Sequence, residues 1–193
     1  MRVQTEEWRR FIPGIRMYKG KKTLFWNGEP LYSTKSESDE PRIYDEQERE
    51  SWKVLIVLPG VEVIPYATFR KCNQLETVIM SDSVRRIEDW AFHNCWSLVF
   101  IKLSRNLDYI GIDSFEDCTS LPSIFIPPSC REMYYGSFQG CKKLIILHVP
   151  QHTRLGSKMI EDTALIRASP FEVLQNGSYD FDINENVHEW IKI

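Results

Sequence analysis

A fixed spacing of 23 residues runs through the middle of the chain and limits what it can fold into more than any other feature. Phenylalanine recurs at this step as Phe69, Phe92, Phe115 and Phe138, and a cysteine follows each of them three residues later. Five further columns keep the same step and are nearly all apolar: Leu75, Leu98, Leu121 and Leu144; Val78, Ile101, Ile124 and Leu147; Met80, Leu103, Ile126 and Val149; Val61, Val84, Leu107 and Cys130; Ile64, Ile87, Ile110 and Met133. A constant period of this length is the signature of a repeat protein, in which each unit buries its apolar side against its neighbours.

Two local patterns within each copy suggest the shape of one coil. Val78 and Met80 are spaced with period two, which predicts a short strand with these two side chains facing inward. Phenylalanine, cysteine and leucine then fall three residues apart, which is typical of one side of a helical turn. A period of 23 also lies within the roughly 20 to 29 residues of leucine-rich repeats. We therefore expect an α/β-type leucine-rich-repeat solenoid of about four repeats plus degenerate end repeats, with parallel strands on one face and short helical turns on the other.

The copy from Ile87 to Leu103 resembles the BspA-like leucine-rich repeat family, whose unit reads approximately Ile-Gly-x-x-Ala-Phe-x-x-Cys-x-x-Leu-x-x-Ile-x-Ile-Pro. The dipeptides Ile110-Gly111 and Ile126-Pro127 supply the family's glycine and proline. The resemblance covers residues 52–166, and its last copy fits only with a one-residue deletion, which indicates a closing repeat. It implies a binding or adhesion module without catalytic residues.

The repeats divide the chain into three parts. We expect an N-terminal cap at 1–50, the solenoid at 51–167 and a C-terminal tail or cap at 168–193, because the end coils of a solenoid need covering. Asn27-Gly28 favours the tight turn of a hairpin over residues 22–32, whose Trp26 and Leu31 would close the first coil.

Other parts of the two caps are read from local patterns. Residues 5–11 look like a short capped helix. Residues 33–50 form an acidic loop that leads into a brief helix before Trp52. The spacing of Val187, Trp190 and Ile191 is that of a small amphipathic helix.

Charge and hydropathy exclude some classes of function. Lys and Arg number 24 against 27 Asp and Glu, a net charge of −3, so no basic surface for nucleic acid is expected. The apolar run at 54–58 is far shorter than the roughly 20 residues of a membrane-spanning helix. Residues 1–7 lack the apolar core of a secretion signal. We therefore predict a cytoplasmic protein with no membrane span.

Catalytic and metal chemistry are not favoured. Four cysteines occur once per coil rather than in Cys-x2-Cys pairs, so we interpret Cys72, Cys95, Cys118 and Cys141 as reduced core residues, although neighbouring coils are close enough for a disulfide. His93 lies near Cys95, but its column also holds Arg, Glu and Gln, which is typical of an exposed edge. The sequence contains no motif of a nucleophilic enzyme or a phosphate-binding loop. We predict no enzyme activity, no metal and no cofactor.

The outward-facing strand positions are the candidate binding surface, since repeat proteins bind through such tiled faces. Alternation assigns two columns to this face: Val54, Thr77, Phe100, Ser123 and Ile146; Ile56, Ile79, Lys102, Phe125 and His148. Six of the ten side chains are apolar, which is unusual for an uncovered surface. All except Ser123 are predicted to bind the partner, with Lys102 and His148 as polar selectors.

Three coverings of this face remain open: a protein or peptide partner, the chain's own terminal segments, or a second copy. The first gives the main hypothesis, a non-catalytic protein-interaction module. The alternative is a cell-surface adhesion or recognition protein whose anchor or signal is absent from this chain, and an enzyme is the least favoured class.

Overall fold

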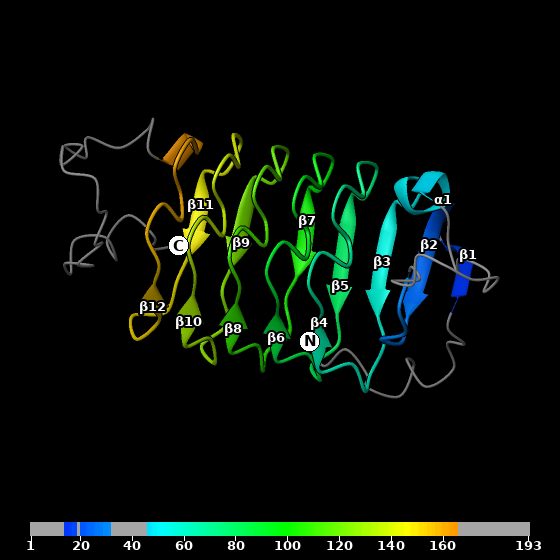
Figure 1. The fold of residues 1–193 in the computed structure, drawn as a ribbon, viewed down its shortest axis with the longest axis horizontal. Coiled ribbons are helices and arrows are strands. Elements are labelled where there is room, and N and C mark those ends of the chain that lie inside the picture. The colour runs from blue at the N-terminus through cyan, green and yellow to red at the C-terminus, as the bar shows by residue number, and fades with distance from the viewer. Residues whose placement is uncertain (1–13, 19, 32–45, 166–193) are drawn as a thin grey trace, which may run out of the picture.

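A computed structural model of the protein describes residues 14–18, 20–31 and 46–165. Its coils lie side by side along the long axis, with β1 and β2 at one end and β11 and β12 at the other (Figure 1). The strands of the first wall are β1 (Gly14–Tyr18), β2 (Lys21–Trp26), β3 (Val54–Val57), β5 (Thr77–Met80), β7 (Phe100–Lys102), β9 (Ser123–Phe125) and β11 (Ile146–His148). Those of the second wall are β4 (Val63–Ile64), β6 (Arg86–Ile87), β8 (Tyr109–Ile110), β10 (Glu132–Met133) and β12 (Arg154–Leu155). A third side, the turn wall, closes each coil, and α1 (Glu46–Glu50) precedes β3.

Strand pairing confirms the predicted solenoid. On the first wall from β3 onward, and from β4 to β10 on the second wall, each paired residue meets the residue 23 positions further along the chain, as Val54 meets Thr77. All these pairs are parallel, because each coil adds one strand to each wall in the same direction. The last pair, β10 with β12, has an offset of 22, since Glu132 meets Arg154.

The repeat columns form the core, as predicted. The phenylalanine rings stack from coil to coil with centroids 5.3 Å, 5.2 Å and 5.3 Å apart from Phe69 to Phe138. Trp26 meets the first of these rings edge-on at 5.1 Å, and both Trp26 and Leu31 are buried. These two residues therefore close the first coil, as the sequence predicted.

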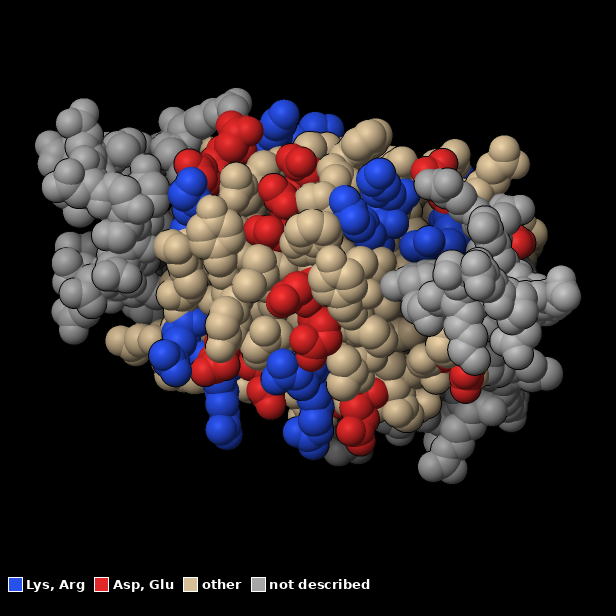
Figure 2. Space-filling model, viewed as in Figure 1, with Lys and Arg blue, Asp and Glu red and all other residues tan. Residues whose placement is uncertain are grey.

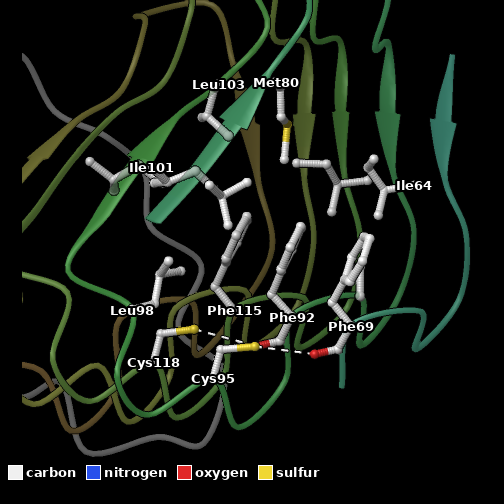
Figure 3. Packing of buried hydrophobic residues seen from close by; sticks show 14 of the residues in the cluster. Ile64, Phe69, Met80, Phe92, Cys95, Leu98, Ile101, Leu103, Phe115 and Cys118 are labelled. Carbon is white, nitrogen blue, oxygen red and sulfur yellow. Dashed lines mark hydrogen bonds between the residues drawn. The ribbon is translucent and has the colours of Figure 1, made fainter. Parts of the chain in front are cut away.

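The cysteines are all free and buried. Each thiol of the later coils donates to a phenylalanine carbonyl of the coil before it. Cys95 Sγ lies 3.2 Å from the oxygen of Phe69, and Cys118 Sγ lies 3.4 Å from that of Phe92 (Figure 3). The cysteines thus act as reduced core residues that also link successive coils, and Cys130 is buried in its own column.

A bulge precedes the strands of both walls. On the first wall the amides of Val99 and Phe100 both donate to the carbonyl of Glu76, at 3.0 Å and 3.2 Å. On the second wall Asp108 and Tyr109 share the carbonyl of Arg85 in the same way, at 2.8 Å and 3.3 Å. Two consecutive amides therefore share one carbonyl of the neighbouring coil, which is the arrangement called a bulge here, and both side chains are at least partly exposed.

The turn wall departs from the predicted helical turns. The amides of Ala67, Phe69 and Lys71 donate to carbonyls of the next coil, while the amides between them donate to the carbonyl three residues earlier and close four-residue turns. Ala67 and Lys71 have positive φ angles of 51° and 60°. A helix needs negative φ throughout and donates its amides within itself, so these segments are turns. Phenylalanine, cysteine and leucine still face the core.

The hairpin prediction was wrong in position. Strand β2 pairs in an antiparallel manner with β1 and in parallel with β3, so the tight turn lies before Lys21 and not at Asn27-Gly28. Residues 27–31 instead form a turn that directly follows β2. The brief helix before Trp52 is present as α1. The predicted helices at 5–11 and around Trp190, and the acidic loop up to residue 45, lie outside the described residues.

Candidate interaction surface

Two of the predicted binding residues do not belong to an exposed face. Val54 and Ile56 are only 8 % and 2 % exposed, and they form a second buried cluster with Phe25 and Leu58. Phe25 on β2 lies beside Ile56 on β3 in the parallel register, so the outer face at this end of the first wall is itself a small core. The prediction that these two side chains are available to a partner was therefore wrong.

The other predicted residues lie together on the outer face of β5 to β11. Phe100 and Phe125 are 53 % and 57 % exposed, and Lys102 is also exposed. Thr77, Ile79, Ile146 and His148 are partly exposed and occupy the neighbouring register positions. The imidazole of His148 stacks on Phe125 with ring centroids 6.2 Å apart. β5 pairs with β7 and β9 pairs with β11, and β7 lies in contact with β9 although the two belong to different sheets, so these side chains share one outer face.

The bulges add residues that alternation alone does not assign to this surface. Val99 and Ile145 stand one position before their strands and are 48 % and 60 % exposed, with the exposed Pro122 between them in the same column. Simple alternation points these positions inward, because it does not allow for the extra residue. We define the apolar patch as these three residues together with the two exposed phenylalanines: Val99, Phe100, Pro122, Phe125 and Ile145.

Charged residues border the patch on the side of β3. Glu76 lies in the same column as Val99, and its carboxylate contacts Lys21 Nζ at 2.5 Å and Lys53 Nζ at 3.2 Å. These two ammonium groups lower the pKa of Glu76 below its usual value. The position before the strand is therefore part of an ion-pair network at β5, where it is Glu76, and part of the apolar patch at β7, where it is Val99.

His93 and Cys95 do not form a catalytic pair. The Cys95 thiol donates to the carbonyl of Phe69, and burial raises its pKa well above the usual value. His93 is half-buried rather than on an exposed edge, because its ring stacks on Trp90 at 5.3 Å and its Nδ1 lies 2.9 Å from Glu116 Oε2. Burial lowers the pKa of His93 and raises that of Glu116, so both groups tend toward their neutral forms.

Neither a metal centre nor a spanning helix is found in the described ranges. No three His, Cys, Asp or Glu side chains at 14–18, 20–31 or 46–165 are placed to share a metal ion. Within these same residues no helix has the length and apolarity needed to cross a membrane.

The comparisons with known proteins agree with this architecture. The family model described as "BspA type Leucine rich repeat region" matches residues 51–169 with six copies. The chain belongs to this family. A search of curated proteins finds no match to the BspA-type chain.

Two solved structures of leucine-rich repeat proteins share the fold of this BspA-type chain. One is a leucine rich cell surface protein of Faecalibacterium prausnitzii, with 32 % identity over 52 % of this chain and a TM-score of 0.51. The other is a leucine-rich repeat protein of Bacteroides ovatus, with 26 % identity over 58 % of this chain and a TM-score of 0.50. The BspA-type chain covers only 27 % and 29 % of the lengths of these two proteins. Repeat proteins of this kind commonly use their extended surfaces for binding.

Proposed function

We propose that this chain is a non-catalytic protein-interaction module that binds a protein or peptide partner on the outer face of β7, β9 and β11. The observation that carries the proposal is the exposure of Phe100 and Phe125, 53 % and 57 %, on adjacent strands of a rigid wall. Large aromatic side chains are among those that dominate binding energy at protein interfaces. With Val99 and Ile145 beside them, they make an apolar area of the kind that monomeric proteins rarely leave uncovered.

The solenoid supports this function by holding the patch in place before the partner arrives. Each patch residue lies on or next to a strand whose inward neighbours are locked in the core, as Ile101 and Ile124 are. Little side-chain or loop ordering then remains to oppose binding, so more of the contact energy appears as affinity. Lys102 and His148 at the edge of the patch supply polar groups that select the partner's orientation.

Site-specific photo-crosslinking tests the proposal. A photoreactive phenylalanine analogue at position 100 or 125 should capture the same partner in extracts of the native host. The analogue at Tyr66, which is 56 % exposed on another side of the coil, is the matched control and should not capture it. A Phe100→Asp change should abolish capture from position 125 while lowering the melting temperature by no more than about 4 °C. Equal capture from position 66, or none from the patch, refutes the proposal, and a cross-link to a second copy assigns the patch to self-association.

A second candidate function is recognition at a cell surface, and the similarity to the F. prausnitzii cell surface protein favours it. In that case the same apolar patch faces outside the cell. Labelling of intact cells with a membrane-impermeant biotin reagent separates the two functions. Labelled protein supports surface recognition, and protein labelled only after lysis supports a cytoplasmic module.

A further inference from the structure

A polar hollow of about 400 Å³ lies on a different side of the molecule from the apolar patch. It is formed by the turns that lead from the first wall to the second in successive coils. Its polar lining includes Arg85, Asn106, Asp108, Arg131 and His152. Basic and acidic side chains alternate along the edge of the solenoid where these turns lie, the lower edge in Figure 2.

The bulges of the second wall set the charges of the hollow in a row. Arg85, Asp108 and Arg131 are each the first residue of a bulge, one per coil. Since neighbouring coils are about 4.8 Å apart, the Cα atoms of the two arginines lie roughly 10 Å from each other, with that of the aspartate between them. The backbone of each coil is fixed to the next, because Asp108 N donates to Arg85 O and Arg131 N donates to Asp108 O at 2.8 Å and 2.9 Å.

The two arginines of the hollow differ from the other arginines of the described residues. Each of the others with a described side chain contacts a carbonyl oxygen, a carboxylate or an aromatic ring: Arg49, Arg70, Arg86, Arg105 and Arg154. Within the described part of the chain, the guanidinium groups of Arg85 and Arg131 have no such partner. Two planar cationic groups with free donors therefore face one solvent-open space.

We propose that this hollow binds a small anionic, hydroxylated ligand of the sugar-acid class. A guanidinium group matches a carboxylate with two parallel hydrogen bonds, and Arg85 or Arg131 supplies this contact. Asp108 accepts hydrogen bonds and repels a second anion, so it selects hydroxyl groups beside the carboxylate. The volume of about 400 Å³ lies in the range of small-molecule sites.

The charge pattern argues against a polyanion as the ligand. Along the bulge column the residues are Glu62, Arg85, Asp108 and Arg131, so the sign alternates from coil to coil. A nucleic acid or polyphosphate needs a continuous basic track, and each carboxylate interrupts it. A short ligand with one anionic group fits the alternation.

Calorimetric titration with sodium D-glucuronate tests the proposal on the full chain. We expect binding that weakens with added salt and is lost with the uncharged methyl ester. Arg85→Gln or Arg131→Gln, whichever removes the guanidinium group that holds the carboxylate, should weaken it by about tenfold, the size expected for hydrogen bonds to a charged group. Arg154→Gln is the matched control: it removes the same charge from an exposed arginine that pairs with Glu132 outside the hollow, and it should leave binding unchanged.

The hydroxyl contact has its own test. The wild type should prefer glucuronate to acetate, and Asp108→Asn should reduce this preference while melting at the same temperature as the wild type. No binding of glucuronate, equal binding of its methyl ester or of acetate, or an equal loss in Arg154→Gln would each overturn the proposal. These outcomes do not test partner binding at the apolar patch, because none of the patch residues lines the hollow.

Discussion

Truncation of Phe92 to alanine measures how much the stacked phenylalanine column contributes to stability. Phe92 is fully buried, and its ring stacks between those of Phe69 and Phe115 at 5.3 Å and 5.2 Å. Removing such a ring leaves a cavity, so we expect the free energy of unfolding to fall by about 3 to 5 kcal/mol. At about 2 to 4 °C per kcal/mol for a chain of this size, the melting temperature should fall by roughly 6 to 20 °C.

Phe100→Ala is the matched control for this measurement. It deletes the same atoms from a ring that is 53 % exposed on the outer face of β7, the strand that follows the turn of Phe92 in the same repeat. The expected cost is about 1 kcal/mol or less, because no enclosed cavity forms. Urea unfolding followed by circular dichroism gives both values under identical conditions. Similar losses in the two variants, or a loss below about 1 kcal/mol for Phe92→Ala, would refute the assignment of inner and outer faces.

Four further predictions concern the core and its edges. Ile56→Asp should prevent stable folding or lower the melting temperature sharply, because it buries an unpaired carboxylate beside Phe25, whereas an exposed Ile56 would tolerate the change. The cysteines should resist alkylation by iodoacetamide at pH 8 until urea unfolds the protein; rapid labelling of the native protein would show that they are not core residues. Burial raises the pKa of Cys72 from 9.0 to about 12, so its stabilising effect is complete below about pH 9 and is lost as the pH rises toward 12. The urea midpoint should therefore be lower at pH 10 than at pH 7, and equal midpoints would contradict this. Gly136→Ala should cost about 1 to 2 kcal/mol, since φ is 63° and the new methyl group would overlap Asp113 Oδ1. The cost should shrink in an Asp113→Ala background, which a thermal double-mutant cycle measures.

Much of the solenoid could be predicted because its core repeats. A side chain such as Phe92 recurs at the same place in each coil, so a single period fixes the strand register and the inward columns. The role of Trp26 as an aromatic residue that closes the column also followed, because an end coil must cover its apolar edge. These inferences need only the spacing and the chemistry of buried side chains.

The errors arose where hydrogen bonds between coils override local patterns. Phenylalanine and cysteine three residues apart suggested a helical turn, but the amides of Ala67 and Phe69 bond to the next coil instead. Alternation missed Val99 because a bulge adds one outward residue before the strand. Ile56 was expected on an open face, yet Phe25, contributed from outside the repeats, makes that part of the face a core. The spacing within one repeat cannot show that a residue from outside the repeats, such as Phe25, covers the outer face.

The bulge of the second wall also explains why the last coil is one residue short. Glu132 is preceded by the bulge residue Arg131, whereas Arg154 follows Thr153 directly and its amide alone bonds to Arg131 O, at 2.8 Å. The residue missing from the closing repeat is thus the bulge residue itself. A coil can therefore lose this one residue while its buried columns stay in line with those of the coil before it.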